Sequence, residues 1–242
     1  MLLKILGSSS KGNGYLLISE GGSTLIVEAG ISLLTIKKAI NFKISSIVGC
    51  IATHCHSDHF GKAKELLKAG IDVYTSGGTI EYSGLKHHRL HCINNGNKVK
   101  IGDFTVLAFS TIHDAPDSIS FLINHPETGN ILFLTDSYYS EFKFRNLNQI
   151  ILEINYDIEI MNTRSLHQSI KNRIITSHMS LETAKELLRS NDLSKVNNIV
   201  LIHLSDGNSH SERFKQEIED LTGKTVTVAD AGTEINLDLT PF

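Results

Sequence analysis

The hydrophobic residues of the chain fall into short runs with two different spacings. Apolar runs that alternate with polar residues, or that continue for four to seven residues between Gly, Ser and Asn, predict β-strands. The Gly- and Ser-rich residues 7–14 are expected to form a loop. The predicted strands cover residues 2–6, 15–18, 24–27, 47–53, 73–75, 98–101, 104–109, 118–123, 130–135, 150–154, 198–204, 224–229 and 234–237.

Four other segments carry apolar residues at helical spacing, over residues 32–42, 62–70, 181–188 and 211–221. Ser32 and Ser180 stand where an N-cap is expected. Both halves of the chain contain several predicted strands, with predicted helices between them. This order predicts an α/β fold of two mixed sheets packed face to face with helices outside, a four-layer αββα sandwich. The length predicts a single domain over residues 1–242.

The composition narrows the possible functions. The 23 Lys and Arg residues are balanced by 26 Asp and Glu residues, so the chain lacks the global positive charge of bulk nucleic-acid binders. Its three cysteines, Cys50, Cys55 and Cys92, are odd in number and widely spaced, which favours a reducing compartment over a disulfide framework. No apolar run is long enough for a signal peptide or a membrane span. We therefore expect a cytoplasmic protein without a membrane partner.

Twelve histidines are unusual in this composition, and three of them lie in one short stretch, T53-H54-C55-H56-S57-D58-H59. If the preceding apolar run is a strand, His54 and His56 point the same way, because side chains alternate along a strand. Asp58 and His59 follow where the chain turns into a helix. Imidazole and carboxylate donors without thiolate favour Zn²⁺, Mn²⁺ or Fe²⁺.

Three further polar residues stand at or near the ends of predicted strands: His113, Asp136 and His203. Active-site groups often lie at strand ends in layered α/β proteins. Taken singly, each is as well explained as a hydrogen-bonded structural or turn residue. Together with the cluster they supply seven donors, which suits a site for two divalent metal ions, Zn or Mn. We read His125, His167 and His210 as surface residues.

The motif H54-x-H56-x-D58-H59, followed in order by His113, Asp136 and His203, resembles the metallo-β-lactamase superfamily. Within it the chain is most similar to the YycJ (WalJ) type of metallohydrolase. The segments that carry this likeness are G7-S8-S9-S10-K11-G12-N13, H113-D114-A115, E153-I154-N155, H178-M179-S180 and H203-L204-S205. Ser177 departs from the pattern, because a Gly is expected before His178.

The resemblance implies roles for these residues. His54, His56 and His113 would hold one metal, and Asp58, His59 and His203 the second. Asp136 would bridge the two ions. In similar phosphodiesterases a histidine at the position of His178, steadied by a carboxylate like Glu153, contacts the scissile phosphate and protonates the leaving oxygen.

The leading hypothesis is a binuclear metal-dependent phosphodiesterase, most plausibly a DNA exonuclease, in which the metals lower the pKa of a water to give hydroxide. Asp58 would orient that hydroxide. Ser9, Ser10, Asn13 and Asn155 are expected to bind substrate, although the 7–14 segment is equally explained as a plain hairpin connection. A basic patch for DNA would have to come from Lys37, Lys38, Lys43, Lys62, Lys64, Lys86 and Arg89.

Two alternatives remain open at this point. The same site would serve a small cyclic or nucleotide phosphodiester, or a thioester. In a different class, the chain would be a non-catalytic metal-binding module, against which the presence of all seven donors argues.

Overall fold

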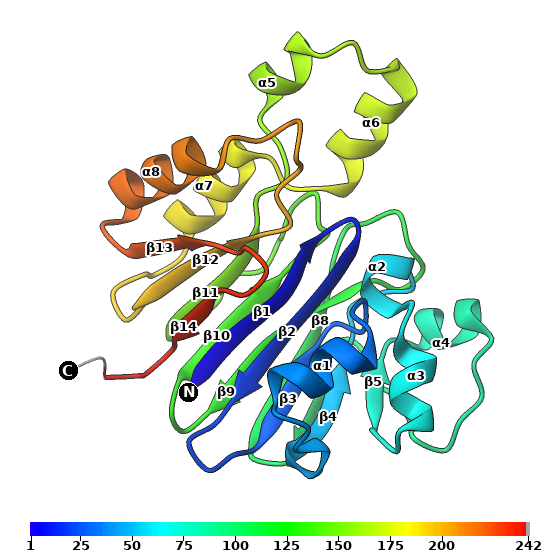
Figure 1. The fold of residues 1–242 in the computed structure, drawn as a ribbon. Helices are drawn as coiled ribbons and strands as arrows, with labels where there is room; N and C mark the ends of the chain where they lie inside the picture. The colour runs from blue at the N-terminus through cyan, green and yellow to red at the C-terminus, as the bar shows by residue number, and fades with distance from the viewer. Residues whose placement is uncertain (241–242) are drawn as a thin grey trace.

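The framework of the protein is a pair of β-sheets packed face to face, as the computed structural model shows for residues 1–240 (Figure 1). Each sheet has seven strands within these residues. The first has the order β14-β1-β2-β3-β4-β5-β6. Its strands are β1 (Leu2–Ser9), β2 (Gly12–Ile18), β3 (Thr24–Val27), β4 (Ile47–Ile51), β5 (Val73–Thr75), β6 (Leu90–Cys92) and β14 (Glu234–Asn236).

The second sheet has the order β13-β12-β11-β10-β9-β8-β7. Its strands are β7 (Lys98–Ile101), β8 (Phe104–Ser110), β9 (Ile119–His125), β10 (Gly129–Leu134), β11 (Leu147–Glu153), β12 (Asn198–Ile202) and β13 (Thr225–Val228). The two sheets are alike in plan. In each, an antiparallel part built from hairpins leads into a parallel part, which is β3 to β6 in the first sheet and β10 to β13 in the second.

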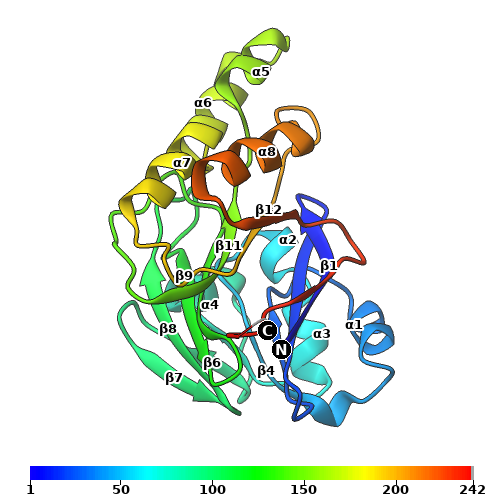
Figure 2. The same cartoon turned by 90° about the vertical axis from the view of Figure 1, so that its left-hand side faces the viewer.

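Helices form the two outer layers. The 3₁₀ turn Ile44–Ser46 leads into β4. Figure 2 shows α1 and α3 on the outer side of the first sheet. The helices are α1 (Leu33–Ala39), α2 (Ser57–Phe60), α3 (Ala63–Lys68), α4 (Gly77–Ser83), α5 (Ile158–Thr163), α6 (Gln168–Ser177), α7 (Leu181–Ser190) and α8 (Ser211–Thr222).

Three hydrophobic clusters hold these four layers together. The central one lies between the sheets and contains Phe104, Phe121 and Phe133, all fully buried. The ring of Tyr15 from the first sheet meets Phe133 of the second edge-on, at 5.4 Å between centroids. A second cluster seals α7 and α8 against one sheet, and a third seals α1 and α3 against the other. Burial of each Phe is worth roughly 1.5–3 kcal/mol, so the contact between the sheets contributes strongly to stability. The αββα sandwich expected from the sequence is confirmed.

Parallel strands place their carboxyl ends at one edge of a sheet, where ligand sites form in α/β proteins. β4 of the first sheet ends at Ile51, and β10 and β12 of the second end at Leu134 and Ile202. The loops that follow these strands carry the polar residues singled out in the sequence. The topology thus brings segments far apart along the chain to a common edge of the sandwich.

The structure corrects several local expectations. Residues 7–14 are not a loop, because β1 runs to Ser9 and β2 starts at Gly12, which leaves a tight turn at Ser10 and Lys11. Helices α4, α5 and α6 were not predicted. His125 is buried rather than on the surface: its ring packs on Phe104, and the Glu127 amide donates to its Nδ1 at 3.2 Å. His125 is the last residue of β9, and its side chain lies on the buried face of that strand.

Candidate metal centre

The segment after β4 carries four of the predicted donors. The chain leaves the buried strand at Ile51 and turns into the short helix α2, for which His56 is the N-cap with extended backbone (φ −60°, ψ 149°). His54 precedes this turn and is 1% exposed. Asp58 and His59 lie on α2 itself. An apolar strand followed at once by a cap and a helical turn thus projects alternating polar side chains over one end of the first sheet.

The other three predicted donors follow strands of the second sheet. His113 lies after β8, Asp136 after β10 and His203 after β12. Asp136 and His203 have left-handed backbone, with φ 45° and 54°. Residues other than Gly rarely adopt this conformation, and when they do they cluster at functional sites, where the surrounding structure holds the strain. The strand ends therefore turn sharply enough to aim both side chains back over the sheet edge.

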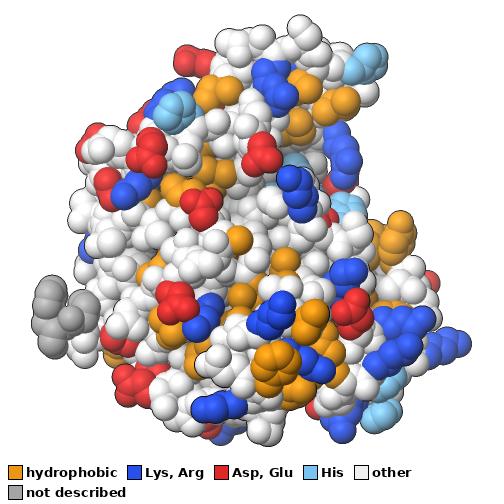
Figure 3. Space-filling view, in the orientation of Figure 1, with side chains coloured by type: hydrophobic (Ala, Val, Ile, Leu, Met, Phe, Trp, Pro, Cys, Tyr) orange, Lys and Arg blue, Asp and Glu red, His pale blue; other side chains and the backbone are white. Residues whose placement is uncertain are grey.

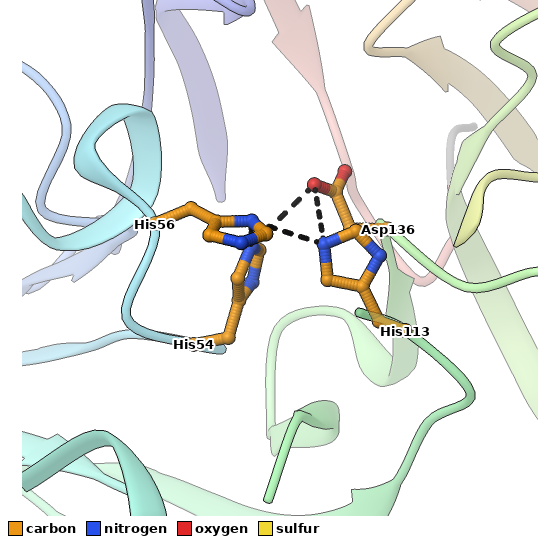
Figure 4. Close-up of side chains that lie close together, drawn as sticks. All are labelled: His54, His56, His113 and Asp136. Carbon is orange, nitrogen blue, oxygen red and sulfur yellow. Dashed lines mark hydrogen bonds and ion pairs between the residues drawn. The ribbon is translucent and has the colours of Figure 1, made fainter. Parts of the chain in front are cut away.

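Four of the donors surround one point (Figure 4). The Nδ1 atom of His56 lies 2.9 Å from His54 Nε2 and 3.1 Å from His113 Nε2. The Oδ2 atom of Asp136 lies 3.6 Å from His54 Nε2 and 3.5 Å from His113 Nε2. Residues 54, 56, 113 and 136 come from three separate stretches of the chain, and the fold brings them together.

The remaining donors surround a second point next to the first. The Nε2 atom of His59 lies 3.3 Å from Asp58 Oδ2 and 3.2 Å from Asp136 Oδ2. His203 Nε2 lies 3.4 Å from Asp58 Oδ2. The same oxygen of Asp136 therefore faces both groups, as a carboxylate shared by two cations would.

These donors fit divalent metal ions in chemistry and in spacing. Imidazole and carboxylate are the ligands of catalytic Zn²⁺ and related ions. Four ligands at about 2.0–2.1 Å around a tetrahedral centre stand about 3.3–3.4 Å apart. The distances within the two groups, 2.9–3.6 Å, bracket this value. Ring nitrogens that face one another this closely are also poorly satisfied without a shared proton or a cation.

Behind the histidines lies a set of groups that fixes their orientation. Thr53 Oγ1 donates to Glu28 Oε1 at 2.7 Å and lies 2.9 Å from His54 Nδ1, so His54 turns its Nε2 toward the first group. His113 Nδ1 donates to the Ser177 carbonyl at 2.7 Å, which likewise frees its Nε2. Such outer contacts set the tautomer and the aim of metal-binding histidines.

The buried carboxylates and the histidines of the site shift one another's pKa values. Burial disfavours the ionised form of Asp136, but the nearby imidazoles of His203 and His59 hold the pKa of its carboxyl well below its usual value. Burial likewise opposes charge on His203, yet the carboxylates around it raise its pKa to about 10. Buried carboxylates thus draw positive charge into the site, and divalent cations satisfy the same demand by displacing protons from the imidazoles.

The pair His178 and Glu153 lies beside the two groups. His178 Nδ1 donates to Glu153 Oε1 at 2.7 Å, and its ring stacks on His203 with 5.6 Å between centroids. Burial lowers the pKa of His178, but the Glu153 carboxylate outweighs this effect and raises it. Glu153 is fully buried and also lies 3.3 Å from His203 Nδ1. The Glu153 carboxylate therefore favours the charged form of an imidazole at the edge of the site.

A pocket of about 700 Å³ opens over this arrangement. Its floor is formed by His56, Asp58, Asp136, His178 and His203, and its wall by α6. Residues 10–148 of the chain match the metallo-beta-lactamase superfamily. The chain belongs to this superfamily.

Relatives within the superfamily include two named exonucleases. The chain is 28% identical to "Exodeoxyribonuclease WalJ" of Streptococcus pneumoniae over 227 residues, which cover 86% of this chain and 83% of the relative. It is 26% identical to "Exodeoxyribonuclease YycJ" of Bacillus anthracis over 231 residues, 88% of this chain and 86% of the relative. The resemblance seen in the sequence is thus confirmed, and the chain is a metallohydrolase.

Solved structures share the fold across nearly the whole chain. The metallo-β-lactamase fold protein YhfI of Bacillus subtilis matches with a TM-score of 0.71 at 17% identity, covering 97% of this chain and 99% of that one. Human tRNase Z, short form, matches with a TM-score of 0.65 at 19% identity, covering 98% and 99%. Within residues 1–240, no helix has the length and apolarity needed to cross a membrane.

The residues expected to bind substrate are placed differently from one another. Ser9 is the last residue of β1, and Ser10 stands in the tight turn that follows it. Ser10 also lines the pocket of about 700 Å³ over the donor groups, which we call the metal pocket. Asn13 is buried behind the donors, where its Nδ2 donates to Asp58 Oδ2 at 3.2 Å. Asn155 Nδ2 donates to the His203 carbonyl at 3.0 Å. The two amides therefore hold Asp58 and His203 in place.

Sequence reasoning missed Glu28, Arg164 and Arg173. Glu28 is fully buried with left-handed backbone (φ 71°), and its Oε1 lies 3.2 Å from His59 Nδ1. The signal was an acidic residue directly after an apolar strand. The two arginines belong to the segment around α5 and α6, two helices that were not predicted from the sequence.

Proposed function

We propose that this protein is a binuclear metal-dependent phosphodiesterase that degrades DNA as an exonuclease. The observation that carries the proposal is the convergence of seven donors in two groups that share Asp136, beside a His178 imidazole held by the Glu153 carboxylate. The relatives named as exodeoxyribonucleases, similar to this chain over most of its length, support the choice of DNA.

The metals are proposed to be two Zn²⁺ or Mn²⁺ ions. His54, His56 and His113 would hold one, Asp58, His59 and His203 the other, and Asp136 both. When bound, such ions lower the pKa of water and neutralise charge on phosphoryl oxygens.

The protein's own side chains would do the rest. The free oxygen of Asp58 would accept a hydrogen bond from the attacking water and orient it. His178, at the mouth of the site, would donate its Nε2 proton to the leaving oxygen, and Glu153 would keep that imidazole charged and aimed. Asn13 and Asn155 would steady Asp58 and His203, while Ser10 would face the substrate.

The surface next to the site supports a polymeric anion as substrate. The net charge is −3, yet Lys and Arg side chains gather over α3 and α4 at the right of Figure 3. A pocket lined by Lys64 and Tyr82 meets the metal pocket at His56 and Ser57. Cations and an exposed aromatic ring are what a nucleic-acid strand requires beside a catalytic centre. The basic residues of α3 and of the loop after α4 are Lys64, Lys68, Lys86 and Arg89, of which Arg89 is paired with Asp72 at 2.9 Å.

The test is a metal-supplemented activity screen over bis-p-nitrophenyl phosphate, single- and double-stranded DNA, and RNA. We expect hydrolysis of the diester and of DNA, with the DNA rate falling steeply as salt rises because bound phosphates release counterions. Asp136→Ala should reduce every rate to that of the buffer. Diester hydrolysis with no salt-sensitive action on DNA would replace the nuclease by a small-molecule phosphodiesterase. No hydrolysis at all would favour a metal-binding module.

A further inference from the structure

A second, smaller pocket adjoins the metal pocket on the side of the β1–β2 turn. It has a volume of about 350 Å³. Ser10, His178 and His203 line both pockets, so the two meet at the imidazole proposed as proton donor. Lys11 and Arg164 also line the small pocket. A group bound there would lie next to a phosphodiester held over the metal centre.

The Arg164 side chain is held in place within this pocket. Its Nη1 donates to Asn208 Oδ1 at 3.1 Å, and Asn208 is itself buried, with its Nδ2 donating to Ser205 Oγ at 3.1 Å. The guanidinium lies directly over Gly207: a Cβ at that position would fall 2.0 Å from Arg164 Nη1. A glycine at 207 is thus what leaves room for the guanidinium.

No acidic partner neutralises these two cations. Among residues 1–240, no Asp or Glu carboxylate lies within 4 Å of the charged nitrogens of Lys11 or Arg164, although the exposed Asp206 also lines the pocket. Arg173, on the other side of the metal pocket, is instead paired with Asp114 at 2.7 Å. An exposed guanidinium tethered only by a neutral amide, in a pocket that a lysine and three serines also line, is suited to a phosphate group.

We propose that the Lys11–Arg164 pocket binds a second phosphate group of the substrate, one linkage away from the phosphodiester at the metal centre. The proposal rests on the proposed phosphodiesterase function and adds a subsite for the neighbouring phosphate of the nucleotide chain, formed by Lys11 and Arg164 outside the metal centre. The planar fork of Arg164 would contact two phosphate oxygens, and Ser9 and Ser10 would supply hydroxyl donors.

Calorimetric titration of the zinc-loaded protein tests this without requiring turnover. Thymidine 3′,5′-bisphosphate carries two phosphates one linkage apart, and thymidine 5′-monophosphate carries one. We expect the bisphosphate to bind at least about tenfold tighter than the monophosphate. In Arg164→Ala the ratio should fall to about one. Equal binding of the two nucleotides by the unaltered protein would overturn the proposal.

Two further variants separate a placed guanidinium from general charge. Gly207→Ala keeps every charge but displaces Arg164, so it should lose the tenfold ratio as Arg164→Ala does. Arg189→Ala removes an exposed arginine at the end of α7, away from the pocket, and should keep the ratio. A ratio that survives in Gly207→Ala, or that falls equally in Arg189→Ala, would show that long-range charge and not this pocket recognises the second phosphate.

Failure of this inference and failure of the proposed function give different results. Hydrolysis of bis-p-nitrophenyl phosphate, which has a single phosphate, depends on the metal centre alone. If the unaltered protein hydrolyses that diester but binds both nucleotides equally, the second phosphate site is wrong and the phosphodiesterase stands. If it hydrolyses no diester yet keeps an Arg164-dependent ratio, the phosphate pocket stands without the enzyme.

Discussion

At the scale of single residues, Thr53 decides how His54 presents itself. Its hydroxyl lies between Glu28 Oε1 and His54 Nδ1 and so fixes which imidazole nitrogen of His54 faces the other donors of the first group. In Thr53→Val the shape is nearly kept but the contact is lost, and we expect zinc affinity to fall about 10–100-fold, the usual cost of an outer-shell contact. Competition with a fluorescent chelator measures this. Thr53→Ser, which keeps the hydroxyl, should lose less than Thr53→Val; equal losses would contradict the role.

His178 is the residue whose role depends on the leaving group. A nucleoside alkoxide needs a proton as it departs, whereas p-nitrophenolate is stable without one. General acids contribute about 10²–10⁴-fold, so His178→Ala should lose that much on a dinucleotide. On bis-p-nitrophenyl phosphate it should lose less than about tenfold. Steady-state rates on the two substrates measure the split. Equal losses on both would assign His178 to binding rather than proton transfer.

At the scale of secondary-structure elements, α7 begins directly after the site. Ser180 Oγ accepts a hydrogen bond from Thr183 N at 3.1 Å, and α7 buries Leu181, Ala184, Leu187 and Leu188 against the second sheet. Removal of this cap in Ser180→Ala should lower the free energy of unfolding by about 1 kcal/mol. Urea denaturation measures the change. Ser180→Asp, which keeps an acceptor at the positive end of the helix, should lose less; a loss as large as that of Ser180→Ala would show that the cap is not the cause.

The elements predicted correctly from sequence are those with a strong apolar pattern. Strands β4, β8, β9 and β12 and helices α7 and α8 bury one face or both, and burial imposes a period that the sequence shows. Helix α6 buries only Ser177, and α5 and α6 project beyond the sheets in Figure 1. Ile170 and Ile174 stand four residues apart on α6 but line the pocket instead of packing into the core, so the helical pattern there was too short to predict the helix. The loop predicted for residues 7–14 was wrong because glycines there were taken as a sign of a loop. They instead allow two strands to pack closely, with Gly7 facing the Gly12 backbone.

The candidate site divides in the same way. The H-x-H-x-D-H stretch is local, so its convergence follows from strand and helix periods alone. His113, Asp136 and His203 were recognisable only as polar ends of apolar strands, and their meeting point depends on the order and direction of the strands in the second sheet. Glu28 and Arg164 act through contacts with residues distant in sequence, His59 and Asn208, and no spacing reveals such contacts.

At the scale of the whole molecule, the two donor groups join the two sheets. His54, His56, Asp58 and His59 follow a strand of the first sheet, whereas the other three donors follow strands of the second. Ions bound between them would therefore tie the layers at one edge, in addition to the apolar core between the sheets. Ligands that bind only the folded state stabilise it by mass action, which makes metal removal a test of the entire arrangement.

Raising free zinc to about 100 times its dissociation constant should add about 2.7 kcal/mol per site to the free energy of unfolding. For a chain of this size each occupied site corresponds to a rise in Tm of roughly 5–10 °C, so two occupied sites should raise the Tm by roughly 10–20 °C over the chelated protein. Differential scanning calorimetry in buffered zinc measures it. His88→Ala, which removes an exposed histidine of the 84–89 loop, should keep the rise, and Asp136→Ala should lose most of it because that carboxylate faces both donor groups. A rise in Tm that persists in Asp136→Ala but disappears in His88→Ala would show that zinc binds at the surface near His88. It would contradict the prediction that zinc joins the two sheets.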